Sequence, residues 1–139
     1  MKERVRVTKR VTFEAAHFLP EYRGACGKLH GHSYKLEITV SGLIETSKLK
    51  EGEKFNPFNG MVIDFKNLKN AINEVVGKYD HSNLNDYFVL PTAECMVASI
   101  YNEFTEYASH FILPEKFKVE SIKLWETEDS YAEYRGETE

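Results

Sequence analysis

The sequence predicts an α+β fold in a single domain over residues 1–139. Two segments near the N-terminus alternate apolar and polar residues as β-strands do, two later segments carry apolar residues at helical spacing, and two short alternating segments follow. Strands that are grouped around helices, instead of alternating with them, indicate one sheet with both helices packed on the same face. The expected order is therefore strand, strand, helix, helix, strand, strand.

Composition excludes several classes of protein. Hydrophobic residues make up 42% and charged residues 29%, which is too apolar for a disordered chain and too varied for a low-complexity one. The 18 Lys and Arg against 22 Asp and Glu give a net charge of -4, so no overall positive field favours nucleic acid or an anionic membrane as a partner. Two cysteines make no disulfide framework, and the chain begins with no apolar leader, so we expect a cytoplasmic protein.

The first two strands are each predicted to have one buried face. The first runs from Val5 to His17, where the apolar residues and His17 share one parity. The second runs from about His30 to Gly42, with His32 and Tyr34 on its apolar face, and the two are expected to pair antiparallel. Their opposite faces are polar, so these faces are either solvated or line a polar lumen that several chains enclose together.

Two helices and two strands are predicted beyond a long polar excursion from Glu45 to Gly60. Asp64 and Thr92 are candidate N-caps, each followed by an amphipathic pattern of helical period. The last two strands are predicted at about Lys118 to Thr127 and at Tyr131 to Arg135. Both helices therefore lie between the two pairs of strands along the chain.

Three histidines have the arrangement of metal ligands. His30 and His32 flank Gly31, so on a strand their side chains project to the same side, about 6.6 Å apart along the chain. His17 ends the first strand on the matching parity, and antiparallel pairing would bring it to the same rim of the sheet. Three imidazoles that leave a fourth position open are typical of catalytic zinc, although iron, nickel and copper also accept them. Ordinary histidines at the rim of a sheet are the alternative.

Cys26 and the Asp80-His81 pair are candidate acid–base groups. Cys26 precedes His30 by four residues and lies among basic residues, so its thiol could act as a base. A fourth zinc ligand and an inert thiol are equally open readings of the same residue. In Asp80-His81 the carboxylate could orient the ring for proton transfer, whereas a simple turn after the helix is the alternative.

A carboxylate on the apolar side of a strand is a candidate ligand contact. Glu126 shares parity with Ile122 and Leu124 in the predicted third strand. A carboxylate in that position needs partners, and a flat heterocycle with two adjacent N–H donors would satisfy both of its oxygens. An Arg or Lys side chain would satisfy them too.

These motifs, in this order, resemble the family of 6-pyruvoyltetrahydropterin synthases and 6-carboxytetrahydropterin synthases. The matching segments cover nearly the whole chain and agree in order and approximate spacing. They are Phe13 to His17, Cys26 to His32, Asp64-Phe65, Asp80-His81 with Leu84 to Asp86, Pro91 to Glu94, and Trp125 to Thr127. The resemblance implies the tunnelling fold (ββααββ), in which the four-stranded antiparallel sheets of three chains close into one barrel with the helices outside, often as a dimer of trimers.

The resemblance also implies a role for each candidate residue. The three histidines correspond to the zinc ligands, Cys26 to the general base and Asp80-His81 to a proton relay. Glu126 corresponds to the carboxylate that binds the 2-amino and ring N–H groups of a pterin, with Thr92 near that pocket. The implied substrate is 7,8-dihydroneopterin triphosphate, from which a base removes a carbon-bound proton while zinc polarises the developing carbonyl and triphosphate leaves.

The spacing before the paired histidines separates the branches of that family. Three residues lie between Cys26 and His30, as in the bacterial and archaeal carboxy-forming enzymes, whereas the animal pyruvoyl enzymes usually have five. The implied products are 6-carboxy-5,6,7,8-tetrahydropterin, acetaldehyde and triphosphate, on the route to 7-deazaguanine nucleosides such as queuosine. A synthase that stops after loss of triphosphate is one alternative, and a zinc- and pterin-binding barrel without catalysis is another. The folate-directed branch carries a glutamate near the cysteine, and residues 27–29 offer none.

Overall fold

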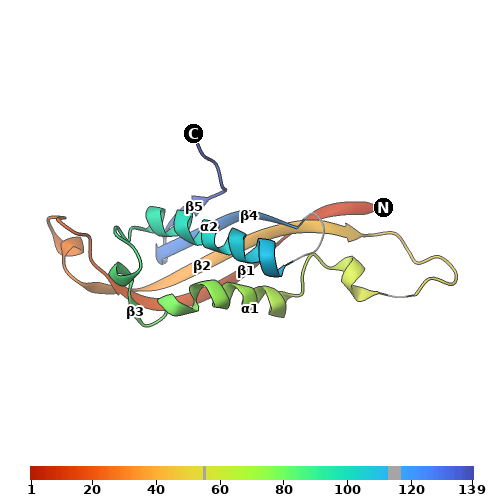
Figure 1. Ribbon diagram of the computed structural model, residues 1–139, viewed down its shortest axis with the longest axis horizontal. Helices are drawn as coiled ribbons and strands as arrows, with labels where there is room; N and C mark the ends of the chain where they lie inside the picture. Colours follow the sequence, from red (N-terminus) through yellow and green to blue (C-terminus); the bar gives the residue numbers. More distant parts are fainter. Residues whose placement is uncertain (55, 113–116) are drawn as a thin grey trace.

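The computed structural model describes residues 1–54, 56–112 and 117–139. Figure 1 shows a twisted sheet whose long strands run beside two helices. The strands are β1 (Lys2–His17), β2 (His30–Glu45), β3 (Ser82–Asn83), β4 (Lys118–Thr127) and β5 (Ser130–Tyr134). The helices are α1 (Phe65–Val76) and α2 (Ala93–Phe111), with short 3-10 turns η1 (Ala25–Gly27), η2 (Pro57–Gly60), η3 (Gly77–Tyr79) and η4 (Leu84–Asp86). The predicted order of strands and helices is confirmed.

The sheet has the strand order β3-β1-β2-β4-β5. Strand β1 pairs antiparallel with β2 from Lys2↔Glu45 to His17↔His30, and β2–β4 and β4–β5 are also antiparallel. The four predicted strands are therefore present, and the first two are longer than predicted because the backbone pairing continues through Lys2↔Glu45, Glu3↔Ile44 and Arg4↔Leu43. Strand β3, which pairs parallel with β1, was not predicted because two residues show no periodicity.

One hydrophobic core lies between the sheet and the two helices. The strands contribute alternate residues to it, which explains why only one parity of each strand is apolar. Its fully buried large side chains are Tyr34, Leu36, Ile38, Leu68, Ile72, Tyr79, Leu84, Met96, Ile100, Phe104, Ile122 and Leu124. Phe65, which fits the predicted apolar stripe of α1, is instead 54% exposed because it begins the helix beyond the edge of this core.

Side-chain caps begin both helices where the sequence predicted them. The carboxylate of Asp64 accepts from the backbone N–H groups of Lys66 and Asn67 at 2.8 and 3.3 Å. The hydroxyl of Thr92 accepts from the N–H of Cys95 at 3.1 Å. These bonds satisfy donors that the first turn of a helix leaves without partners. None of the described helices is long and apolar enough to span a membrane.

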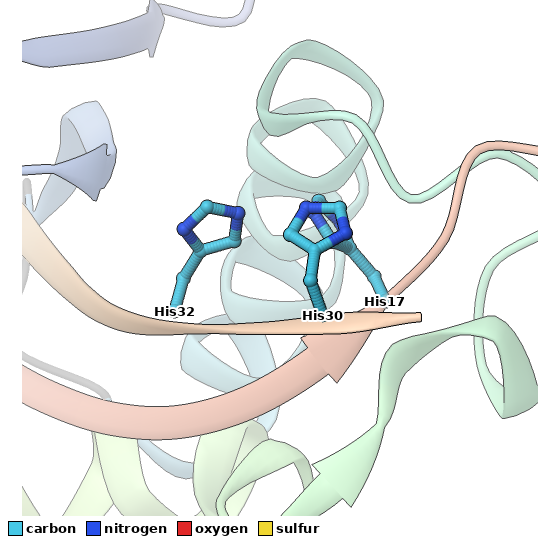
Figure 2. A group of neighbouring side chains, drawn as sticks. All are labelled: His17, His30 and His32. Carbon is cyan, nitrogen blue, oxygen red and sulfur yellow. The ribbon is translucent and has the colours of Figure 1, made fainter. Parts of the chain in front are cut away.

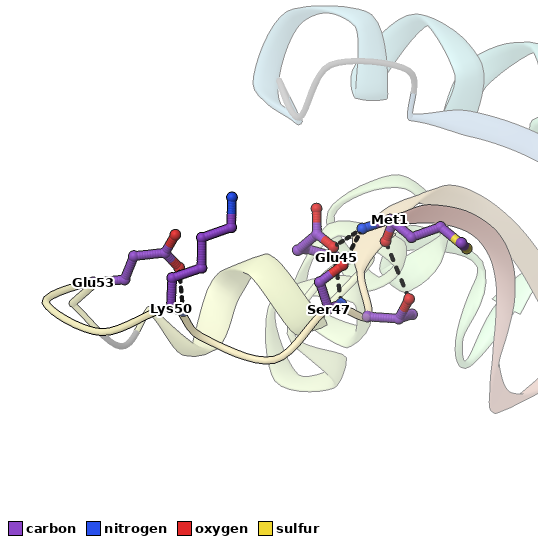
Figure 3. Close-up of polar contacts among 6 residues, drawn as sticks. Met1, Glu45, Ser47, Lys50 and Glu53 are labelled. Carbon is purple, nitrogen blue, oxygen red and sulfur yellow. Dashed lines mark hydrogen bonds and ion pairs between the residues drawn. The ribbon is translucent and has the colours of Figure 1, made fainter.

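The excursion after β2 is tied to the first residue of the chain (Figure 3). The amino group of Met1 donates to the side chains of Glu45 and Ser47, and the Met1 carbonyl accepts from the N–H of Thr46 at 3.0 Å. The bond from this amino group, together with bonds from Ser47, lowers the pKa of Glu45 to about 2. The excursion ends where Val62, which is buried, packs against Gly42. It is therefore anchored at both ends and extends past the sheet between them (Figure 1).

The face of the sheet away from the helices carries polar pairs between strands. Arg10 donates to Glu37 at 2.9 Å, and the hydroxyls of Thr8 and Thr39 lie 2.6 Å apart. Arg10 also lies over the Trp125 ring, 6.0 Å from its centroid. This face is ordered by contacts between neighbouring strands, although none of the helices in the described residues covers it.

Gly27 is required by the tight loop between β1 and β2. The N–H of Leu19 donates to the carbonyl of Cys26 at 2.8 Å, and a Cβ at Gly27 would lie 2.1 Å from the carbonyl oxygen of Tyr22. We expect Gly27→Ala to lower the free energy of unfolding by about 1–3 kcal/mol, because backbone must move to admit the methyl group. Urea denaturation measures this change.

Gly77→Ala is the matched control. Gly77 has a helical φ of -58° after α1, and a Cβ there would meet nothing within 4 Å. Alanine at such a position stabilises by about 0.4–1 kcal/mol through the unfolded chain. Equal changes in the free energy of unfolding for the two variants would contradict the role of Gly27.

Candidate metal centre

Three imidazoles meet at the end of the β1–β2 ladder. His17 and His30 are register partners, and His32 follows on the same face of β2. Their ligand-capable nitrogens all lie within 4.8 Å of one another. Figure 2 shows the three rings projecting from the two strands to the same side, toward α2. His17 is buried, and the other two are half-buried. The predicted convergence of the three histidines is confirmed.

Backbone carbonyls fix the orientation of two of the rings. The Nδ1 atom of His17 lies 2.7 Å from the Pro91 carbonyl oxygen, and the Nδ1 atom of His30 lies 2.7 Å from the Lys28 carbonyl oxygen. A carbonyl oxygen only accepts, so each Nδ1 carries a hydrogen, and in the neutral form of the ring Nε2 keeps a lone pair. These contacts are of the kind that orient metal-binding histidines.

The donor set fits a metal ion. The Nε2 atoms of His17 and His30 face each other at 3.1 Å, a separation that either a proton shared between them or a metal ion bound by both would stabilise. Two nitrogens bound to one tetrahedral zinc ion at about 2.0–2.1 Å are about 3.3 Å apart, close to this separation. The Nε2 atom of His32 is buried and makes no hydrogen bond to any described residue. All three rings therefore offer a nitrogen to the same space.

Burial keeps the third ring in the form that binds metal. Desolvation lowers the pKa of His32, the neighbouring His17 and His30 lower it further, and Glu126 opposes them. A ligating imidazole must be neutral, so the lowered pKa favours coordination. The Oε1 atom of Glu126 lies 3.3 Å from the Nε2 atom of His32, outside hydrogen-bond geometry.

Tyr34 packs against the histidine cluster, a contact that was not predicted from the sequence. It is fully buried, and its hydroxyl lies 3.2 Å from the Nδ1 atom of His17. Its ring meets the edges of His17 and His32 at centroid distances of 6.1 and 5.7 Å. Burial, with a smaller effect of Glu126, raises its pKa, so the phenol stays neutral. Because residues 32 and 34 lie on the same face of a strand, the parity that Tyr34 shares with His32 could have indicated this contact.

Glu126 lies at a β-bulge beside a cavity. The pairing of β4 with β5 shifts between Trp125 and Thr127, so Glu126 has no partner in the ladder. A bulge changes the direction of a side chain, and Glu126 here lines a cavity of about 690 Å³. The N-terminus of α2, through Ala93 and Glu94, forms another wall of this cavity. The cavity and the histidine cluster therefore share Glu126 as a neighbour.

Asp80 and His81 interact as predicted, but away from the cluster. The Nδ1 atom of His81 lies 3.0 Å from the Asp80 carboxylate, and the backbone of Glu14 holds both residues. The N–H of Glu14 donates to Asp80 at 2.9 Å, and the N–H of His81 donates to the Glu14 carbonyl at 2.6 Å. The first bond, with a smaller effect of His81, holds the pKa of Asp80 below its ordinary value.

His81 lies beside the polar face of the sheet, next to Glu14. His81 lines a hollow with Glu14 and Ser33, whose side chains belong to the polar face, and His32 lines the same hollow. The φ of His81, 58°, is uncommon for a residue other than glycine. The metal-ligand histidines project from the opposite, apolar face. Strained backbone of this kind is concentrated at functional sites.

Cys26 and Thr92 also lie outside the histidine cluster. Among the described residues the cluster holds only the three histidines, so in this structure the thiol of Cys26 does not close it as a fourth ligand. Cys26 is half-buried in η1. The hydroxyl of Thr92 caps α2 and is occupied as an acceptor, which leaves its hydrogen free to donate.

Residues 6–137 match the family described as 6-pyruvoyl tetrahydropterin synthase. The chain belongs to this family. An Archaeoglobus fulgidus protein named putative 6-carboxy-5,6,7,8-tetrahydropterin synthase is 37% identical over 97% of this chain and 99% of its own length. The Haemophilus influenzae 6-carboxy-5,6,7,8-tetrahydropterin synthase is 30% identical over 94% of this chain and 98% of its own length. A Pyrococcus furiosus dihydroneopterin monophosphate aldolase is 31% identical over 88% of this chain and 90% of its own length.

A solved structure supports the fold of this family member. The 6-pyruvoyl tetrahydropterin synthase of Caenorhabditis elegans superposes with a TM-score of 0.75 over 97% of each chain, at 22% identity. At 22% identity this structural similarity establishes the fold alone. The α+β arrangement with two helices on the sheet is thereby confirmed.

Removal of one ring should abolish tight metal binding. We expect the purified protein to hold one divalent ion per chain and His32→Ala to lose it, because two imidazoles remain where three converged. Metal content by mass spectrometry after dialysis measures this. His110→Ala is the matched control, since His110 is exposed near the end of α2, outside the cluster. Wild-type protein without metal, or unchanged metal content in His32→Ala, would contradict the site.

Proposed function

We propose that this family member is a zinc-dependent lyase that converts 7,8-dihydroneopterin triphosphate to 6-carboxy-5,6,7,8-tetrahydropterin, acetaldehyde and triphosphate. The observation that carries the proposal is the match to relatives named for the 6-carboxy product over almost the entire chain. The three converging histidines beside Glu126 supply the chemistry that such a reaction needs. The product would feed synthesis of 7-deazaguanine nucleosides of the queuosine type, in the cytoplasm.

The metal would be held by His17, His30 and His32. A bound zinc ion supplies a Lewis acid that polarises substrate oxygens. The carbonyls of Pro91 and Lys28 keep the Nε2 atoms of two rings free for the ion, and the buried Tyr34 excludes water from one side. No further described carboxylate or thiol joins the cluster, so a coordination position is left for substrate.

Glu126 would hold the pterin ring. Its carboxylate lines the cavity next to α2 and lies 3.3 Å from His32, so a ring bound there has its side chain near the metal ligands. Two carboxylate oxygens match the adjacent 2-amino and ring N–H donors of a pterin. Thr92 caps α2 directly before Ala93, which lines this cavity, and would add a hydroxyl contact.

Cys26 would serve as the base and Asp80-His81 as the proton relay. Asp80 fixes the orientation of the His81 ring, which is exposed and free to meet a substrate. Because His81 lies with residues of the polar face while the three ligand rings project from the apolar face, we propose that chains associate and that His81 reaches a site across a subunit boundary. A trimer or a dimer of trimers would also cover the open edges that β3 and β5 leave.

The product of the reaction tests the function directly. Incubation of the metal-loaded protein with dihydroneopterin triphosphate should release acetaldehyde in step with a 6-carboxypterin chromophore, because the side chain is cleaved beyond the loss of triphosphate. Chromatography of the pterin and trapping of the aldehyde measure both. Formation of 6-pyruvoyltetrahydropterin without acetaldehyde would show the sister activity, and binding without turnover would show a non-catalytic barrel. Dihydroneopterin monophosphate, the substrate class in the Pyrococcus relative's name, is the comparison substrate.

Cys26→Ala should separate catalysis from metal binding. The thiol lies outside the histidine cluster, so we expect the variant to keep its metal and lose turnover. Metal content and product formation are measured on the same preparation. Loss of the metal in this variant would instead make Cys26 a ligand and the site a closed, structural one.

Glu126→Gln should weaken pterin binding more than it alters metal content. One acceptor oxygen becomes a donor that faces the donors of the pterin, which costs about 1–3 kcal/mol in binding free energy. Titration calorimetry with a non-reactive pterin measures this. Glu128→Gln, an exposed neighbour outside the cavity, is the control. Equal affinity in wild type and Glu126→Gln would contradict this placement.

A further inference from the structure

Asn85 continues the pairing of β3 with β1 after the backbone of β3 has turned away. Strand β3 pairs Ser82 with Ala15 and Asn83 with Ala16, and the chain then turns into η4. The Asn85 side chain next pairs with Phe18, at the same separation of 67 residues. Its Oδ1 accepts from the Phe18 N–H and its Nδ2 donates to the Phe18 carbonyl, both at 2.9 Å. The side-chain amide thus takes the place of a peptide group in the ladder.

This amide pair locks the end of the strand that carries His17. His17 is the last residue of β1, and its last backbone partner across the sheet is His30. Strand ends fray unless the residues beyond them are held, and Phe18 is held by Asn85. By contrast, His32 lies inside the β1–β2 ladder, where neighbouring pairs on both sides fix it. His17 therefore depends on contacts outside the β1–β2 pair more than His32 does.

One segment fixes both the backbone and the ring of His17. Asn83 orients Asn85, because its Oδ1 accepts from the Asn85 N–H at 3.0 Å. Six residues beyond Asn85, the Pro91 carbonyl accepts from the His17 ring at 2.7 Å. Segment 83–91 thus holds the main chain after His17 at one point and the imidazole at another. A shift of this segment would move the Nε2 atom of His17.

We propose that Asn85 is a positioning residue for the metal centre, which sets His17 at the distance that shared coordination requires. The proposal rests on the metal site of the proposed function. Asn85 does not contact the three histidine rings. It holds the backbone of Phe18, and through the main chain it thereby positions His17. Site geometry must hold within about 0.5 Å for productive coordination, which a frayed strand end does not provide.

Metal affinity tests this role in the full-length protein. We compare Zn²⁺ affinity, by competition with a chromogenic chelator, in wild type, Asn85→Ala and Asn85→Asp. Alanine removes both bonds to Phe18, whereas aspartate keeps the acceptor and places a second carboxylate oxygen against the Phe18 carbonyl. We expect both variants to bind zinc about 10–100-fold more weakly. Asp86→Ala, an exposed neighbour in the same 3-10 turn, should bind as wild type does.

Two further measurements separate positioning from loss of fold. Amide hydrogen exchange of Phe18 in metal-free protein should be faster in Asn85→Ala than in wild type, while far-ultraviolet circular dichroism stays unchanged. The absorption bands of bound Co²⁺ should differ between wild type and the Asn85 variants, because the ligand geometry differs.

Each outcome decides a different claim. Wild-type protein that binds no zinc would overturn the metal site and this proposal with it. Wild-type binding together with folded Asn85 variants of equal affinity would overturn the role of Asn85 alone. Unfolding of both Asn85 variants would also overturn it, since Asn85 would then stabilise the fold without a specific effect on the site.

Discussion

The pairing register of β1 with β2 decides where the Nε2 atoms of His17 and His30 meet, 3.1 Å apart. They meet because β1 and β2 pair over their full length in one register that ends at His17↔His30. A slip of one residue would turn His17 to the opposite face, since side chains alternate along a strand. The same register places Phe13 against Tyr34 in the core, so burial of the core and convergence of the ligands are specified together.

The histidine cluster is held by residues that lie directly before α2 and β2. The Pro91 carbonyl, just before α2, and the Lys28 carbonyl, in the loop before β2, each fix one ring. Thr92 then caps α2, so the start of this helix is set by residues next to the site. Because α2 and the β4–β5 turn also wall the cavity beside Glu126, the position of α2 controls both the cluster and the cavity. The cluster is thus part of the core boundary.

The sequence predicted those parts of the site that depend on strand parity. His17, His30 and His32 were found because alternation fixes their face, and Asp80-His81 because neighbours in sequence can touch. The carbonyls of Pro91 and Lys28 could not be found, since every residue has a carbonyl and only the loop path aims it. The amide pair between Asn85 and Phe18 was missed for a related reason: β3 is too short for a period, so nothing marked residue 85 as its continuation.

Strand β1 serves both faces of the sheet at once. Its odd-numbered residues lead to His17 on the apolar face, while Glu14, of the other parity, holds Asp80 and His81 through its backbone at the polar face. His81 therefore lies with residues of the polar face, whereas the three ligand rings project from the apolar face, although His32 also lines the hollow beside His81. Cross-strand contacts such as that of Arg10 with Glu37 already order the side chains of the polar face. An ordered polar face of this kind is suited to packing against the polar face of another chain. In the proposed function, the alternation that builds the histidine cluster is thus the reason for assigning proton transfer by His81 to an assembly of chains and not to a single chain.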